Sequence, residues 1–82
     1  MYKVYIIYSL KLDRYYIGHT ENIAIRLQRH IHGISVFTAS ADDWVLKYIE
    51  EFETRAAAHA RERQIKKKKS RRYIEWLINS AG

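Results

Sequence analysis

The chain has 82 residues, of which 48% are hydrophobic and none is cysteine. Disulfides and zinc sites built on thiolates are therefore excluded, and a single domain over residues 1–82 is expected. Lysine and arginine total 15 against 9 aspartate and glutamate residues, a formal net charge of +6 at pH 7. No apolar run approaches the roughly 20 residues that span a bilayer, and the N-terminal residues are typical of a strand rather than of a signal peptide. We therefore expect a cytoplasmic protein without a membrane anchor.

Two segments near the N-terminus are predicted to form a β-hairpin. Residues 3–9 (KVYIIYS) and 14–19 (RYYIGH) are rich in β-branched and aromatic side chains, and LKLD lies between them. If the loop has an even number of residues, Tyr5 opposes Gly18 and Ile7 opposes Tyr16, all on one sheet face. The two tyrosines then meet diagonally over a residue without a side chain. A shift of one residue in the loop would reverse this inference.

The segment after the hairpin, residues 20–33 (TENIAIRLQRHIHG), is predicted to be a helix. Asn22 is a suitable N-cap, and Gly33 follows the last turn. Arg26 and His30 are one turn apart on one edge of the apolar stripe, where a cleft is expected. The stripe itself consists of Ile23, Ala24, Leu27 and Ile31.

The second half of the chain predicts a loop, a third strand and two helices. Residues 34–43 have the composition of a loop, and residues 44–52 (WVLKYIEEF) that of a strand. Thr54 caps a helix over residues 55–69, and Ser70 caps a final helix over residues 71–79. One face of the first of these helices carries Ala58, Glu62, Ile65 and Lys69, and the core face of the second carries Ile74, Leu77 and Ile78. The element order β-β-α-β-α-α indicates an α+β fold.

Positive charge is concentrated in one part of the sequence. Residues 55–72 carry nine basic side chains and one carboxylate, Glu62, whereas residues 1–54 carry six basic and seven acidic side chains. Such a surface favours a polyanion as partner, although a lysine run is also compatible with a solvated helix face. The predicted nucleic-acid contacts are Lys66, Lys67, Lys68, Lys69, Arg71 and Arg72.

The chain contains side chains of each kind that phosphodiester cleavage requires. The reaction needs a base that activates water, a divalent cation, and a cationic side chain on the phosphate oxygens. Glu62 could hold the metal and Arg26 could bind the phosphate through two hydrogen bonds. The tyrosines or His30 could move protons.

Each of these residues also has an ordinary structural interpretation. Strand tyrosines usually pack in cores or across strands, and an arginine such as Arg26 is often solvated. A cation such as His30 suits the C-terminal end of a helix, and Glu62 could pair with Lys66 one turn later. Asn79 could be only part of the last helical turn.

The order and spacing of several motifs resemble the signature of the GIY-YIG nucleases. The motifs are VYI (4–6), YIG (16–18) and N-x-x-x-R-L (22–27), followed by His30, Gly33, a Phe-Thr pair (37–38), Trp44 and RERQIKK (61–67). The resemblance covers essentially the whole chain and is greatest to the small single-domain branch similar to the N-terminal catalytic domain of the bacterial excinuclease. Two positions depart from the pattern: Lys3 replaces the glycine of the first motif, and Val36 stands where many relatives carry a basic residue.

The resemblance implies a role for each matching residue. Tyr5 and Tyr16 match the motif tyrosines, one of which helps to activate the attacking water, and Gly18 matches the glycine that leaves room in the cleft. Arg26 matches the arginine on the scissile phosphate, and His30 matches a histidine that assists proton transfer.

The resemblance also implies a cofactor and an activity. Glu62 matches the carboxylate that holds a single Mg2+ or Mn2+, and Asn79 is the candidate for an asparagine that several members use after the metal helix. The implied protein is an α+β domain, a three-stranded antiparallel sheet flanked by helices. Its implied activity is that of a metal-dependent DNA endonuclease, structure-specific or weakly sequence-specific and linked to DNA repair or recombination.

Two other functions compete with this one. The same scaffold could be a nucleic-acid-binding module without catalysis, which the presence of all matched catalytic positions disfavours. A structural or protein-binding domain would leave the coincidence of Arg26, Glu62 and the two tyrosines unexplained.

Overall fold

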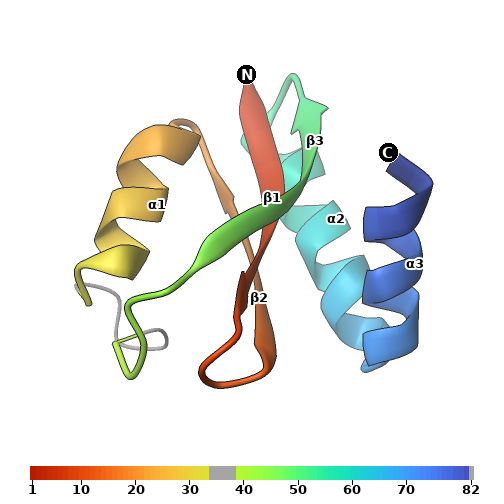
Figure 1. The fold of residues 1–82 in the computed structure, drawn as a ribbon. Helices are drawn as coiled ribbons and strands as arrows, with labels where there is room; N and C mark the ends of the chain where they lie inside the picture. The colour runs from red at the N-terminus through yellow and green to blue at the C-terminus, as the bar shows by residue number, and fades with distance from the viewer. Residues whose placement is uncertain (34–38, 82) are drawn as a thin grey trace.

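The computed structural model describes residues 1–33 and 39–81. Its elements are β1 (Tyr2–Ser9), β2 (Arg14–Thr20), α1 (Ile23–Ile31), β3 (Val45–Phe52), α2 (Arg55–Lys68) and α3 (Arg71–Ala81). The strands form an antiparallel sheet in the order β2-β1-β3. Helix α1 lies on one side of this sheet, and α2 and α3 lie on the other (Figure 1). The predicted α+β fold with the order β-β-α-β-α-α is confirmed.

The hairpin has the predicted register. Tyr5 pairs with Gly18 and Ile7 pairs with Tyr16, so these four residues share one face of the sheet. The turn between the strands uses Asp13 in the left-handed conformation, with φ of 51°, which aspartate tolerates better than most residues. The pairing of β1 with β3 has one irregularity, between Ile6 and Ile7.

Polar caps begin the three helices at the predicted residues. The side chain of Asn22 accepts a hydrogen bond from the amide of Ile25, and that of Thr54 accepts one from Ala57. The hydroxyl of Ser70 accepts one from the amide of Tyr73. Each of these bonds satisfies an amide that has no partner within its helix. Helix α3 extends to Ala81, two residues beyond the predicted end.

The sheet separates two hydrophobic clusters. The cluster on the α2 and α3 side has as its buried residues Val4, Ile6, Ile17, Ala58, Ile65 and Leu77. The cluster on the α1 side has as its buried residues Tyr5, Ile7, Ala41 and Trp44, with side chains of α1 packed against it. Because strand side chains alternate, one hairpin supplies residues to both clusters.

One detail of the predicted stripe on α1 is wrong. Ala24 is exposed, whereas His30 is buried, with 1% of its surface accessible. The helix is therefore rotated so that His30 faces the sheet together with Ile23, Leu27 and Ile31, which all pack on the Tyr5 cluster. A histidine is tolerated there because its ring nitrogen has a buried hydrogen-bond partner.

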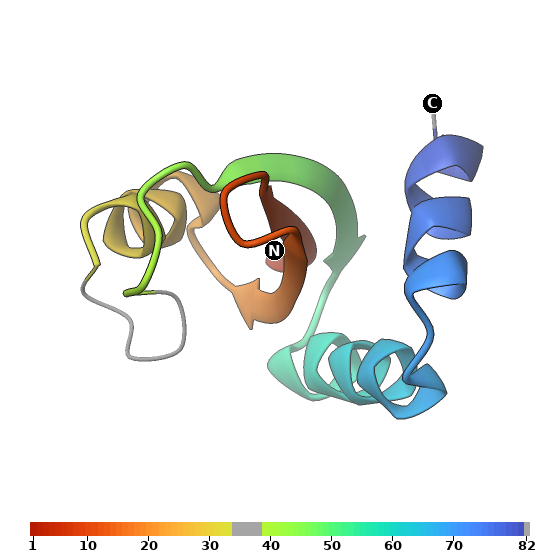
Figure 2. The ribbon, with the colours of Figure 1, turned by 60° about the horizontal axis from the view of Figure 1, so that its bottom comes forward.

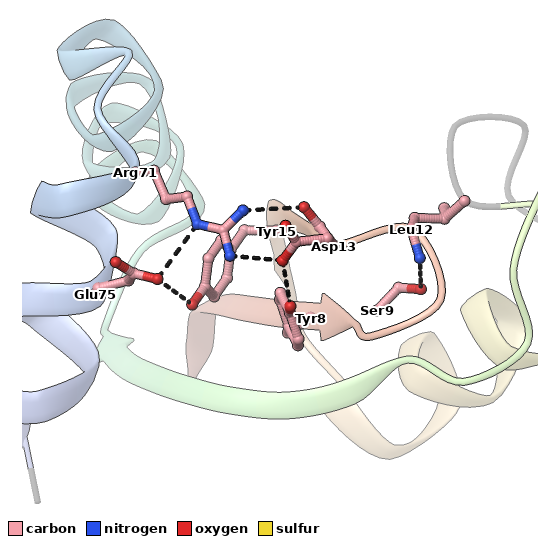
Figure 3. Close-up of polar contacts among 7 residues, drawn as sticks. All are labelled: Tyr8, Ser9, Leu12, Asp13, Tyr15, Arg71 and Glu75. Atoms are coloured by element: carbon pink, nitrogen blue, oxygen red, sulfur yellow. Dashed lines mark hydrogen bonds and ion pairs between the residues drawn. The ribbon is translucent and has the colours of Figure 1, made fainter.

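Helix α3 is tied to the turn of the hairpin by Arg71. Its guanidinium donates to the carboxylate of Asp13 at 2.6 Å and to that of Glu75 at 3.3 Å. The hydroxyls of Tyr8 and Tyr15 donate to the same two carboxylates, as Figure 3 shows. Figure 2 shows α3 turning away from the end of α2 at this junction. We call this group of residues the Arg71 cluster.

The predicted loop lies only partly within the described residues. Of the loop predicted over residues 34–43, residues 39–43 contain no helix or strand, and residues 34–38, with Val36 and the Phe-Thr pair, lie outside the described residues. Among the described residues, no helix has the length and apolar character needed to cross a membrane.

Candidate active site

The centre of the candidate site is the hydroxyl of Tyr5 on β1. Tyr5 is buried, with 2% of its surface accessible, and its ring lies over Gly18 on the neighbouring strand. A Cβ atom at Gly18 would lie 2.5 Å from the Tyr5 hydroxyl oxygen and 2.7 Å from Cζ. The ring of Tyr16 follows diagonally, with its centroid 6.4 Å from that of Tyr5. Glycine at position 18 is therefore what allows Tyr5 to lie flat against the hairpin.

His30 connects α1 to this tyrosine pair. Its Nε2 lies 2.8 Å from the Tyr5 hydroxyl oxygen in a buried hydrogen bond, and its ring centroid is 4.9 Å from that of Tyr16. Burial lowers the pKa of His30, and the nearby positive charge of Arg26 lowers it further. A neutral His30 that carries its proton on Nδ1 accepts a hydrogen bond from the Tyr5 hydroxyl at Nε2.

The pKa of Tyr5 reflects charged or ionisable groups on three other elements, β2, α1 and α2. Burial raises it most, the neighbouring Tyr16 raises it further, Arg26 lowers it, and the carboxylate of Glu62 raises it. Arg26 comes from α1 and Glu62 from α2, on opposite sides of the sheet. The Tyr5 hydroxyl therefore lies within the electrostatic reach of every other predicted catalytic side chain.

Arg26 is half-buried on α1. Among the described residues, no carboxylate forms an ion pair with its guanidinium, whereas Arg61 and Arg71 are both paired. Its charge acts on the pKa values of Tyr5 and His30. An arginine held near buried aromatic groups without an acidic partner has its donors available for an incoming anion.

Glu62 holds the opposite side of the site. Its side chain is 13% exposed, and Nδ1 of His19 donates to one carboxylate oxygen at 2.6 Å while Nζ of Lys66 donates to the other at 2.7 Å. Burial raises the pKa of Glu62, but the hydrogen bonds from Lys66 and His19 outweigh it and leave the pKa below its usual value. The carboxylate is thus ionised and oriented before any ligand arrives.

The donor set around Glu62 fits one kind of metal ion. In the described part of the chain, no three histidine, aspartate or glutamate side chains are grouped to hold a metal. A zinc site built from several protein ligands is not provided there. Mg2+ commonly binds through one or two carboxylates and completes its shell with water and substrate phosphate. A single oriented carboxylate fits that mode, provided that the ion replaces the ammonium of Lys66.

The basic residues predicted to contact nucleic acid differ in their surroundings. The side chains of Lys66, Lys67, Lys68 and Lys69 are exposed, as is that of Arg72. The Lys66 ammonium pairs with Glu62 and also lies 5.8 Å from the ring centroid of Tyr16. Arg71 is engaged in the Arg71 cluster. Asn79 is exposed near the end of α3, and no hydrogen bond joins its side chain to the described site residues.

His19 is a site residue that the sequence motifs do not indicate, and its ring orients Glu62 across 43 positions of the chain. The available signal was strand alternation, because the residue after Gly18 must point to the opposite face of the hairpin, where α2 packs. Its ring also lies 5.3 Å from that of His59 on α2. Which residue of α2 faces His19 depends on how that helix is rotated about its axis. The positions of Ala58 and Ile65 in the sequence do not determine that rotation.

The fold and this site define a recognisable class of domain. Two tyrosines on a hairpin, an arginine and a histidine on the next helix, and a carboxylate on the helix after the third strand are the features of a GIY-YIG domain. Residues 1–74 match the family model described as the GIY-YIG catalytic domain, and the chain belongs to this family. Domains of this family are typically nucleases that use divalent metal ions, which implies a DNA substrate. The comparisons with curated proteins and with solved structures give no match.

The family match leaves the individual residues untested. The catalytic roles of Tyr5, Tyr16, Arg26, His30 and Glu62 stay predictions, as do the single domain over residues 1–82 and the roles of the basic residues.

Proposed function

We propose that the protein is a Mg2+- or Mn2+-dependent DNA endonuclease of the cytoplasm that hydrolyses phosphodiester bonds and serves DNA repair or recombination. The observation that supports this proposal most directly is the electrostatic environment of Tyr5. Its hydroxyl bonds to His30 and its pKa responds to Tyr16, Arg26 and Glu62. These are the side chains for a proton transfer, a phosphate contact and a metal ion, and His30 bonds directly to the Tyr5 hydroxyl while the others influence its pKa.

In the proposed reaction, the tyrosines and His30 handle the proton of the attacking water. The pKa of Tyr5 is raised, so Tyr5 remains a phenol at neutral pH and acts as a proton relay rather than as a standing phenolate. His30 is kept neutral by burial and accepts the proton that leaves the Tyr5 hydroxyl. Tyr16 is half-exposed beside this pair and faces the substrate. Proton transfer of this kind contributes roughly 100- to 10,000-fold to a rate.

Arg26 and Glu62 act on charge in the proposed reaction. Arg26 donates to the oxygens of the scissile phosphate, where charge increases as the bond from water to phosphorus forms and the bond to the leaving sugar oxygen breaks. Glu62 would hold the divalent ion, which supplies Lewis acidity at the phosphate when bound. Lys66 then moves from Glu62 to the DNA backbone, beside the exposed Lys67, Lys68 and Lys69.

One observation favours the alternative function, a DNA-binding module without catalysis. Both oxygens of Glu62 are engaged by side chains of the protein itself, and one of these is the ammonium of Lys66. If Lys66 holds Glu62 more tightly than a divalent ion does, the basic helix binds DNA and no cleavage follows.

A cleavage assay with matched variants distinguishes the two functions. Labelled linear, nicked, flapped and branched DNAs are incubated with the purified chain in Mg2+, in Mn2+ and in chelator. Glu62→Gln keeps the size of the side chain and removes its charge, and Glu51→Gln makes the same change at an exposed position of β3. We expect metal-dependent cutting that Glu62→Gln lowers by at least about 100-fold and that Glu51→Gln retains. Equal activity of the two variants would remove Glu62 from the site, and DNA binding without cutting in every condition would establish the alternative.

A further inference from the structure

A groove runs beside the candidate site along the free edge of β2. It has a volume of about 420 Å³ and lies between β2 and the junction of α2 with α3. Tyr16 and Lys66 are among its lining residues, and the Lys66 ammonium pairs with Glu62, so the groove borders the candidate active site. Its lining also includes the apolar side chains of Ile17, Ile65 and Ile74 and the ring of Tyr15. We call it the β2 groove.

The rim of the β2 groove carries positive charge that the protein does not neutralise. Arg14 and Lys69 line the groove and are exposed, and neither forms an ion pair within the described part of the chain. The one carboxylate in the lining, that of Asp13, is held at 2.6 Å by Arg71. An anion that enters the groove therefore meets two cations without acidic partners.

The backbone around the groove shows a second unusual feature. Among the described residues, the non-glycine residues with positive φ are Asp13, with φ of 51°, and Lys69, with φ of 48°. Both line the β2 groove. Position 69 ends α2 in the left-handed conformation, where glycine is the favoured residue. The chain places a lysine there at a conformational cost, which is explained if the lysine side chain is needed at the rim.

We propose that the β2 groove binds an unpaired nucleotide of the DNA strand next to the scissile phosphate, with Arg14 and Lys69 on its phosphates. A duplex presents its phosphates to a protein surface and keeps its bases stacked inside, so cations alone would serve it. Apolar and aromatic side chains in one groove with two cations match a single strand, whose bases and sugars are accessible. This inference rests on the proposed function, because it takes the scissile phosphate to lie beside Tyr16 and Lys66. It assigns flapped, splayed and single-stranded DNA as the preferred substrate class.

The test compares Lys69→Gly with Lys67→Ala in the full chain. Lys69→Gly removes the rim cation and relieves the left-handed backbone, so the variant is expected to melt at or above the temperature of the parent. Lys67→Ala removes one charge from an exposed position of α2 that does not line the groove. Fluorescence anisotropy with a labelled oligothymidylate and with a labelled duplex hairpin, both in chelator, measures binding without cleavage.

We expect Lys69→Gly to weaken binding of the single strand about fivefold to tenfold through loss of one charge-assisted contact. It should also reduce the salt dependence for the single strand by roughly 0.7 in the logarithmic slope. Lys67→Ala should lower affinity for both DNA forms alike and by less. Arg14→Ala should reproduce the selective effect of Lys69→Gly. If Lys69→Gly lowers the affinities for the single strand and for the duplex in the same proportion as Lys67→Ala does, the groove is not a binding site.

Cleavage separates this inference from the proposed function. If the protein cuts splayed DNA and the groove variants cut it as well as Lys67→Ala does, the groove inference fails and the nuclease proposal stands. If no DNA is cut but Lys69→Gly selectively loses the single strand, the groove stands as a single-strand binding site, and both the nuclease proposal and the position of the groove beside a scissile phosphate fail.

Discussion

The contact between Gly18 and Tyr5 makes a prediction whose sign can be worked out from the structure. Replacing a strand glycine by alanine normally stabilises a protein by roughly 0.5–1 kcal/mol when space allows, because the unfolded chain loses freedom. At Gly18 the added Cβ would lie 2.5 Å from the Tyr5 hydroxyl oxygen and 2.7 Å from Cζ. Tyr5 is 2% exposed, so its ring has no open space into which it can move.

The expected destabilisation has two sources. Overpacking of a filled core costs about 1–3 kcal/mol, and a Tyr5 hydroxyl moved from its 2.8 Å bond with His30 costs about 1–3 kcal/mol as an unpaired buried group. After the favourable backbone effect is allowed for, Gly18→Ala should destabilise the fold by about 1–5 kcal/mol. For a domain of this size, each kcal/mol corresponds to about 4–8 °C in melting temperature.

Thermal unfolding followed by circular dichroism measures this effect, and the cleavage assay measures its consequence for the site. The variant should melt at least about 4 °C below the parent and should lose cleavage at temperatures where it remains folded. Adding Tyr5→Phe removes the atom in closest contact with the new Cβ. The double variant should therefore lose less free energy of unfolding than the two single variants lose in total. A Gly18→Ala protein that melts at or above the parent temperature would refute the packing argument.

Three further predictions concern the residues around this contact. Arg26→Ala should slow cleavage by about 100- to 1,000-fold. Arg29→Ala, on the exposed side of the same helix, should change the cleavage rate little. Equal cleavage rates of the two variants would exclude a phosphate contact by Arg26. The pKa of His30 is lowered from 6.5 in the folded protein, so the unfolded chain binds the proton more readily and stability should fall as the pH drops below 6.5. Urea unfolding at pH about 7.5 and about 5.5 should therefore show a smaller loss of stability in His30→Gln than in the parent. Arg71→Ala should lower the melting temperature by roughly a few degrees, because it releases the hairpin turn, while the exposed Arg72→Ala should not; identical melting curves would show that the Arg71 cluster adds nothing to stability.

Much of the fold follows from local sequence features. Strand alternation and an even loop place Tyr5 and Tyr16 on one face with Gly18 between them, and the observed register agrees. Asn22 and Thr54 mark the helix starts because their side chains accept hydrogen bonds from nearby amides. These features depend on residues close together in the chain, which is why the sequence reveals them.

The parts that the sequence does not reveal depend on long-range contacts. The burial of His30 follows from a hydrogen bond to Tyr5, 25 positions away, and a helical stripe alone favoured the hydrophobic Ala24 instead. His19, the partner of Glu62, is 43 positions away in the chain. Strand alternation predicts the sheet face on which His19 lies, but it does not predict how the facing helix is rotated. Arg71 lies in the basic segment that predicts nucleic-acid contacts. In the structure it pairs instead with Asp13, which is 58 positions away in the chain.

The position of the sheet between the two hydrophobic clusters has a consequence for how the protein loses activity. Helix α1 has nine residues, of which only His30 is fully buried, so its attachment depends on a few side chains packed on the Tyr5 cluster. Short elements with little buried surface open in partial unfolding events that leave the rest of the domain intact. The α1 side therefore sets the thermal limit of function, since its detachment removes Arg26 and His30 while the cluster beneath α2 and α3 still holds the sheet together. Amide hydrogen exchange should be fastest in α1, and heat inactivation should precede the melting of the sheet.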